Sequence, residues 1–298
     1  MNYPKAIVTI AIGKQYVSDW EKYCLQSWRR YCDRHGFDLL PIRETLDTSE
    51  RASSRSVSWQ KCLILSQAFA NSYERIVWVD SDILFNDCAP DITAGVPVEK
   101  IGVVESCEFS SPHFMKRVFR LWGDGEAVIN HSAREYYKQY GLPDDVDRVF
   151  NAGVLVLSPK HHRSILEHVY YTYEEKEGGR KWHMEQRPLA YEVIKSGLAH
   201  WIDPRFNVIL WSEEYMHYPF LQSPPCPRMP RPKAIVRRIK QKFRTVSGRT
   251  RYALQRNLRA EMVNTVFQAS YFLHFASRTE EMSLVRVRAR LWWDVLES

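Results

Sequence analysis

Short apolar runs alternate with longer stretches of helical spacing through the first two thirds of this chain. This alternation restricts the possible folds strongly, because it is the pattern of strands joined by crossover helices. It predicts an α/β domain with a mixed, largely parallel sheet flanked by helices. The expected strands are 6–12, 37–41, 75–79, 101–104, 153–157 and 200–202, and the expected helices are 16–35, 58–71, 163–174 and 185–196.

The domain organisation follows from a break in this pattern. The Pro-rich segment 223–232 continues neither a helix nor a central strand. Residues 228–260 then carry twelve Lys or Arg and no acidic residue, whereas the rest of the chain holds 30 basic against 35 acidic residues. We expect one main domain over 1–222, a Pro-rich and basic insertion over 223–260, and a C-terminal segment over 261–298 that returns to the core.

Targeting signals and cysteine spacing bear on location. The opening apolar run 6–12 is too short for a signal-peptide core, and no stretch approaches the roughly 20 residues of a membrane-spanning helix. The six cysteines show no C-x-x-C spacing, so neither a zinc site nor a disulfide scaffold is indicated. These features predict a cytoplasmic protein.

The stretch 236–244 is amphipathic and cationic. It fits peripheral contact with an anionic membrane or binding of an acidic acceptor, and it fits nucleic acid less well. A solvated surface insertion explains the stretch equally well.

Two carboxylates follow the expected strand 75–79 directly, at Asp80 and Asp82. The carboxyl ends of strands form the edge at which open α/β sheets bind ligands, and carboxylate oxygens suit Mg²⁺ or Mn²⁺. A divalent ion at this edge could bridge the phosphates of a nucleotide sugar. A solvent-exposed turn capped by Asp would give the same tripeptide.

Several motifs, taken in order, resemble glycosyltransferases of the GT-A fold, especially the retaining glycogenin-like and lipopolysaccharide galactosyltransferase-like group. They are 6–10, Trp59-Gln60-Lys61, 77–82 with its DxD motif, 150–158, Glu185-Gln186 and His274-Phe275. The resemblance covers roughly residues 6–278 and implies a GT-A-like, Rossmann-like fold. It also implies transfer of a sugar from a nucleotide-diphosphate donor, most commonly a UDP-sugar, to a hydroxyl of a glycan, lipid-linked or protein acceptor, with retention.

The same resemblance assigns roles to individual residues. Asp80, Asp82 and His274 would bind Mn²⁺ or Mg²⁺, with His274 supplied by the C-terminal segment that completes the active site. Asn151, Glu185 and Gln186 would face the reacting sugar, although the family commonly has Asp where this chain has the longer Glu185. The other residues implied at the donor are Thr9, Ala11, Lys61, Ser81, Ala152, Gly153 and Arg278. A tryptophan could also stack on the sugar or base, although ordinary packing explains these residues equally well: Trp59, Trp78, Trp182 and Trp211.

Three rival functions remain at the level of sequence. A sugar nucleotidylyltransferase would carry a Gly-rich loop after its first strand, where this chain has only Gly13. A phosphatase of the aspartyl-phosphate type would carry Asp-x-Asp after the first strand of the fold, whereas Asp80 comes later. A non-catalytic protein that binds membrane or nucleic acid through the basic segment leaves one ordered set of residues unexplained: Asp80, Asp82, Asn151, Glu185 and His274.

Overall fold

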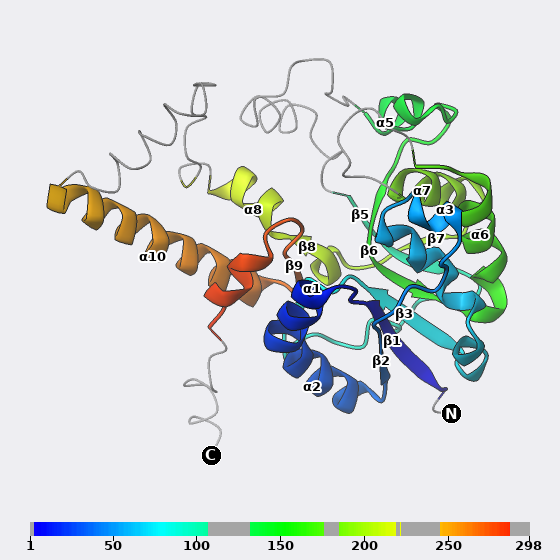
Figure 1. The fold of residues 1–298 in the computed structure, drawn as a ribbon, viewed down its shortest axis with the longest axis horizontal. Coiled ribbons are helices and arrows are strands. Elements are labelled where there is room, and N and C mark those ends of the chain that lie inside the picture. Colours follow the sequence, from blue (N-terminus) through cyan, green and yellow to red (C-terminus); the bar gives the residue numbers. More distant parts are fainter. Residues whose placement is uncertain (1–2, 107–131, 176–184, 219–220, 222–244, 287–298) are drawn as a thin grey trace.

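A six-stranded mixed sheet forms the centre of the protein (Figure 1). The computed structural model describes residues 3–106, 132–175, 185–218, 221 and 245–286, with side chains of the last range described from 254 onward. The strands lie in the order β2-β1-β3-β6-β5-β7, and every pairing is parallel except the two that β6 makes. The expected mixed, largely parallel sheet is therefore confirmed. Its strands are β1 (Lys5–Ile10), β2 (Asp38–Ile42), β3 (Arg75–Val79), β5 (Ile101–Glu105), β6 (Phe150–Leu157) and β7 (Ala199–Trp201).

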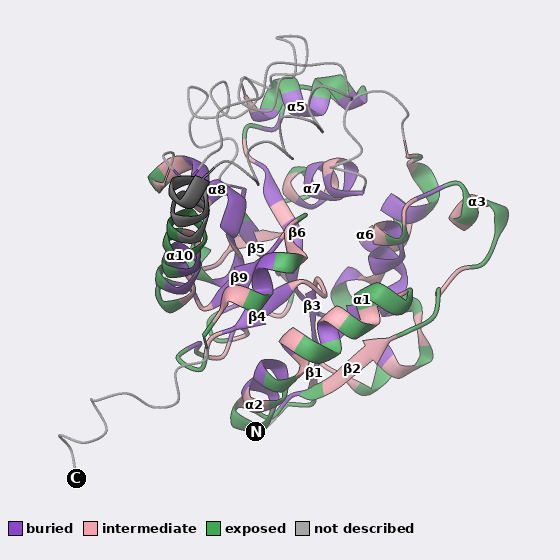
Figure 2. Ribbon diagram, turned by 60° about the vertical axis from the view of Figure 1, so that its left-hand side comes forward, coloured by how far each residue is buried: buried purple, intermediate pink, exposed green. Residues whose placement is uncertain are grey.

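Two apolar clusters cover the two faces of this sheet. Successive side chains of a strand point to opposite faces, and accordingly Ala6 and Val8 of β1 enter one cluster while Ile7 enters the other. The first cluster packs against α5 (Ala133–Tyr140), α6 (Pro159–Thr172) and α7 (Gln186–Lys195). The second packs against a continuous helical segment made of α1 (Lys14–Asp19), the π-helical turn η1 (Trp20–Cys24) and α2 (Leu25–His35). Figure 2 shows the resulting buried centre between exposed helical faces.

The segment expected as a helix over 58–71 differs from the prediction. After the short α3 (Glu50–Ser53), it forms two 3₁₀ helices, η2 (Val57–Ser66) and η3 (Ala68–Ser72). All residues from 59 to 65 are buried, so the segment has no exposed face to mark a 3.6-residue period. The expected α-helix is wrong here, because apolar spacing cannot distinguish helix types in a segment that is enclosed on all sides.

A second, three-stranded sheet joins the C-terminal region to the main sheet. It consists of β4 (Ile83–Phe85), β9 (Phe272–His274) and β8 (Val208–Ile209), with β9 in the middle. Phe85 and Phe272 stack with ring centroids 3.8 Å apart, and Trp28 of α2 stacks on Phe85 at 4.7 Å. These aromatic contacts fix β9 against the residues that follow β3.

Helix α10 (Thr245–Ala269) precedes β9 and extends away from the central sheet (Figure 1). It continues without interruption through residue 260, where the sequence suggested the end of the basic insertion. The remaining elements are η6 (Pro204–Asn207), α8 (Leu210–His217) and η8 (Thr279–Leu284). Among the described residues, no helix combines the length and apolar character needed to cross a bilayer.

Candidate functional site

The backbone holds Asp80 and Asp82 at the junction of the two sheets. Asp80 follows the last residue of β3, and its amide donates a hydrogen bond to the carbonyl of Gly153 at 2.8 Å. Asp82 immediately precedes β4, and its carbonyl accepts a hydrogen bond from the amide of Phe275 at 2.9 Å. Strand β6 therefore fixes one aspartate and the chain after β9 fixes the other.

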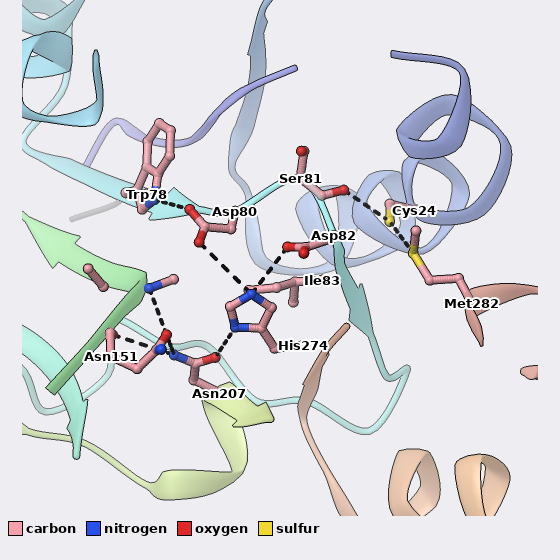
Figure 3. A network of polar contacts seen from close by, with 12 residues as sticks. Cys24, Trp78, Asp80, Ser81, Asp82, Ile83, Asn151, Asn207, His274 and Met282 are labelled. Atoms are coloured by element: carbon pink, nitrogen blue, oxygen red, sulfur yellow. Dashed lines mark hydrogen bonds and ion pairs between the residues drawn. The ribbon is translucent and has the colours of Figure 1, made fainter. Parts of the chain in front are cut away.

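His274 completes a three-residue cluster with these carboxylates (Figure 3). It lies on β9 opposite Ile83 of β4. Its Nε2 atom lies 3.2 Å from Asp82 Oδ1 and 3.9 Å from Asp80 Oδ2. One ligand atom from each of the three residues lies within 4.8 Å of the others, so the fold brings together side chains 194 positions apart in the chain, from 80 to 274.

The cluster fits a divalent cation by its donor atoms and by its charge. Two carboxylates and one imidazole nitrogen form a donor set that suits Mn²⁺, whereas imidazole is less typical of Mg²⁺. Among the residues that the structure describes, the carboxylates of Asp80, Asp82 and the adjoining Glu185 lie around one ammonium group, that of Lys61. Three carboxylate charges against one ammonium charge leave two negative charges when the imidazole is neutral, as it is when it binds a metal, and a divalent cation would neutralise them.

The protonation of the cluster reflects competition between burial and charge. Burial by itself would raise the pKa of Asp82, but the adjacent His274 outweighs it and the pKa of this carboxyl is lowered. Burial by itself would lower the pKa of His274, but Asp82 and then Asp80 outweigh it and the pKa of the imidazole is raised. Each group therefore favours the charged form of its neighbour while no cation lies between them.

Lys61 is a buried cation beneath the cluster. Its Nζ atom donates to Asp80 Oδ1 at 3.2 Å, to the carbonyl of Ala152 at 3.1 Å, and pairs with Glu185 Oε1 at 2.8 Å. Burial lowers the pKa of Lys61, but the charges of Asp80 and Glu185 prevail and the pKa is raised. The pKa of Glu185, which burial would raise, is lowered by Lys61. Glu185 therefore holds Lys61 in position.

A chain of amides connects the cluster to α7. Asn151 Oδ1 accepts from the amide of Gly153 at 2.9 Å and from Asn207 Nδ2 at 2.8 Å, and Asn151 Nδ2 donates to Gln186 Oε1 at 3.2 Å. The same Gln186 oxygen accepts from the amide of Ala152 at 3.2 Å. Asn151 and Gln186, two of the three residues expected to face the sugar, are therefore bonded to each other and to the backbone of β6.

Gly153 is required by the closeness of β6 to His274. A Cβ atom at this position would lie 2.6 Å from His274 Cε1 and 2.9 Å from both His274 Nδ1 and Asn151 Oδ1. Side-chain atoms do not approach so closely without displacement. Because Gly153 has no side chain, the imidazole of His274 can lie beside the aspartates.

The other residues named from the sequence make contacts of their own within the fold. Thr9 and Ala11 are buried at the end of β1, and Ser81 contributes its carbonyl oxygen to a contact with Cys24 Sγ at 3.5 Å. Arg278 pairs with Glu214, and that carboxylate also accepts from Arg259 at 2.6 Å. Among the tryptophans, Trp78 Nε1 donates to Asp80 Oδ1 at 2.9 Å, Trp59 and Trp211 are buried, and Trp182 lies outside the described residues, as does the stretch 236–244.

Two residues that contact the expected site residues are not among those named from the sequence. Asn207 bridges His274 and Asn151, and Glu214 is the fully buried partner of Arg278. Asn207 is a polar residue between Phe206 and Val208 just after the expected strand 200–202, which is a weak signal because such positions are usually turns. Glu214 lies within α8 and carries no sequence signal that separates it from exposed helical glutamates.

Comparisons with known proteins give similarity of structure but not of sequence. No protein-family model and no curated protein matches this sequence. One similar solved structure is a glycosyltransferase involved in the glycosylation of the major capsid of PBCV-1, with a TM-score of 0.48 and 16% identity over 94% of this chain and 100% of that one. A second is the bifunctional glycosyltransferase WbbM, with a TM-score of 0.48 and 12% identity over 93% of this chain and 46% of that one.

A third similar structure is the galactosyltransferase LgtC in complex with donor and acceptor sugar analogs, with a TM-score of 0.40 and 16% identity over 76% of this chain and 84% of that one. All three are glycosyltransferases, the class that the sequence motifs resemble. At these scores and identities the likeness assigns neither an activity nor a substrate to this chain, because one fold hosts many functions.

Proposed function

We propose that this protein is a metal-dependent glycosyltransferase that transfers a sugar from a nucleotide-diphosphate donor to an acceptor hydroxyl. The observation that carries the proposal is the cluster of Asp80, Asp82 and His274, whose ligand atoms lie within 4.8 Å of one another at the carboxyl end of β3. That edge is where α/β sheets bind their ligands. A cation bound there would supply positive charge to the departing diphosphate.

The residues around the cluster provide the positioning that such a reaction needs. Lys61 fixes Asp80 from below and is itself fixed by Glu185, so the carboxylate has a defined orientation. Asn151 Nδ2 makes one hydrogen bond among the described residues, to Gln186, and an amide nitrogen carries two hydrogens. Its second hydrogen is the group that we assign to a donor hydroxyl. Rigid placement of such groups reduces the entropic part of the barrier.

The identity of the reactants follows the sequence resemblance. It supports a UDP-sugar as donor, retention at the anomeric carbon, and a glycan, lipid-linked or protein acceptor. The imidazole of His274 supports Mn²⁺ over Mg²⁺. Free thiols at Cys24, Cys32, Cys62 and Cys88 support a reducing, cytoplasmic location.

Peripheral contact with an anionic membrane forms part of the proposal. Leu254 and Leu258 of α10 are 56% and 41% exposed and lie one helical turn apart, and Arg256 is exposed on another side of the same helix. Apolar and cationic side chains on one exposed helix suit a bilayer surface with negative charge. Sedimentation with phosphatidylserine-containing vesicles and with neutral vesicles tests this part, and equal sedimentation with both, or with neither, would exclude it.

The function is tested by calorimetry with a panel of nucleoside diphosphates and nucleotide sugars, each with Mn²⁺ and with a chelator, followed by a transfer assay. Asp82→Asn removes an anionic ligand beside His274, and we expect it to lower Mn²⁺-dependent turnover by roughly 100-fold or more while the fold is retained. Asp87→Asn is the matched control, since Asp87 lies on the surface in an ion pair with Arg30. Unchanged turnover in Asp82→Asn would remove this site from the proposal.

A further inference from the structure

Asn207 is buried between the candidate cation site and the amide of Asn151, and it bonds to both (Figure 3). It is the last residue of η6, directly before β8, which pairs with the strand that carries His274. Its Oδ1 lies 2.9 Å from His274 Nδ1, and its Nδ2 lies 2.8 Å from Asn151 Oδ1. Both ends of one carboxamide are therefore used within the site.

The orientation of this carboxamide is set by backbone groups. The amide of Gly153 donates to one atom of the Asn151 side chain at 2.9 Å, so that atom must be the oxygen. The Asn207 atom that faces this oxygen must be a donor, which identifies it as nitrogen. The same nitrogen lies 3.5 Å from the main-chain carbonyl of Asn151, a group that only accepts. The Asn207 oxygen consequently faces His274.

The orientation of Asn207 determines which imidazole nitrogen carries hydrogen. Because an amide oxygen only accepts, His274 Nδ1 must donate the hydrogen bond between them. In the neutral ring, Nε2 then carries the lone pair, and Nε2 is the atom that lies 3.2 Å from Asp82 Oδ1. The lone pair therefore points to the space between the carboxylates.

We propose that Asn207 is a positioning residue that holds His274 with Nε2 available to a divalent cation and that joins the cation site to the Asn151 amide. The inference rests on the proposed function, since it assigns Asn207 to the metal centre proposed there. Partners of this kind fix the ring orientation of a metal-bound histidine, and their loss typically weakens metal binding about 10- to 100-fold. The connection through Asn207 also means that the cation site and the sugar-facing amide have one shared support.

Two substitutions separate the two hydrogen bonds of Asn207. Asn207→Leu removes both the acceptor for His274 Nδ1 and the donor to Asn151. Asn207→Asp keeps an acceptor for His274 Nδ1 but cannot donate to Asn151. Asn264→Leu is the matched control, because Asn264 is also buried and its amide bonds to Ala260, Leu284 and Arg286, away from the cluster.

The experiment is a titration of the full chain with Mn²⁺ alone, read by the electron paramagnetic resonance signal of the free ion, together with pulsed detection of imidazole nitrogen coupled to bound Mn²⁺. We expect Asn207→Leu to raise the Kd for Mn²⁺ roughly 10- to 100-fold and to remove or weaken the nitrogen coupling. Asn207→Asp should retain the coupling and a Kd within about threefold of the wild type, because an acceptor still orients the ring. Asn264→Leu should change neither quantity, even where it lowers the melting temperature.

The outcomes distinguish this inference from the proposed function. Wild-type Kd and nitrogen coupling in folded Asn207→Leu would overturn the inference alone, and an equal loss in Asn264→Leu would reduce Asn207 to a general packing role. Asn207→Ala serves in place of Asn207→Leu if the latter does not fold. A wild-type protein that binds no Mn²⁺ would overturn the cation site and the inference together, whereas the expected Mn²⁺ results without any sugar transfer would count against the proposed function only.

Discussion

Alanine at position 153 would place a methyl group against the ring of His274. The added Cβ would lie 2.6 Å from His274 Cε1, whereas carbon atoms in favourable contact lie about 3.5 Å apart. The ring would therefore have to move by about 0.9 Å, and the hydrogen bond from His274 Nδ1 to Asn207 lies directly beside the contact. Overpacking of this kind costs about 1–3 kcal/mol of stability.

The functional effect of Gly153→Ala should exceed its effect on stability. A displacement of about 1 Å at a reacting centre can reduce a rate about 100-fold, so we expect turnover to fall by roughly that factor and Mn²⁺ binding to weaken. The assays are Mn²⁺ titration, the transfer rate and urea denaturation of the same preparations. Wild-type Mn²⁺ affinity in Gly153→Ala would refute the reasoning, because the ring would then have accepted the methyl group without leaving its position.

Gly102→Ala provides a matched control for this prediction. Its Cβ would lie 2.9 Å from Val156 Cβ and 3.3 Å from Ile202 Cγ2, so the substitution also overpacks the central sheet, but away from the cluster. We expect a comparable loss of stability with Mn²⁺ affinity close to that of the wild type. If both alanine variants lose affinity in proportion to stability, the effect at Gly153 is general destabilisation.

Two further predictions concern buried charge. The pKa of His162 is lowered by burial from 6.5 to about 4, and below pH 6.5 the unfolded chain binds a proton that the folded chain refuses, so stability falls as the pH falls towards 4. This proton linkage of His162 lowers the free energy of unfolding by about 2 kcal/mol at pH 5. Urea denaturation at pH 7.5 and pH 5 should therefore show that His162→Asn loses less stability over this interval than the wild type. An equal loss in both proteins would contradict the assignment. Glu185→Gln leaves the buried ammonium of Lys61 with Asp80 as its remaining carboxylate partner, and should lower the free energy of unfolding by about 3 kcal/mol. The double variant with Lys61→Met should be more stable than the sum of the single effects, and strict additivity would show that the pair is not coupled.

The main sheet could be predicted from the sequence because each strand carries a local signal. The run 75–79 is buried at every position and was expected with the bounds that the structure shows. The 3₁₀ segment at 57–66 differs from the expected helix, because the continuous burial of residues 59–65 removes the period by which helix types are recognised. The small sheet of β4, β8 and β9 depends on pairing between residues 83–85 and 272–274, and no local pattern encodes such a distant partner.

The residues of the candidate site also differ in how well the sequence alone predicts them. Asp80 and Asp82 carry a local signal, since two carboxylates directly follow a buried strand. His274 was identified through a family resemblance, because nothing in its own segment distinguishes a ligand from a buried histidine. Asn207 and Glu214 gain their importance only from side chains that the fold brings to them, through contacts with His274 and Arg278.

The ion pairs of Arg278 restrict how that residue could contact a donor diphosphate. Arg278 pairs with Glu214, whose side chain is fully buried, so a phosphate contact that drew the guanidinium away from this pair would leave behind a carboxylate that cannot reach water. Stranding a buried carboxylate costs several kcal/mol. Arg259, however, also bonds to Glu214 at 2.6 Å and to Glu281 at 2.6 Å. Glu214 therefore keeps a cationic partner if Arg278 turns away. The movement of Arg278 breaks one hydrogen-bonded ion pair, and a new bond from Arg278 to a phosphate oxygen can replace it.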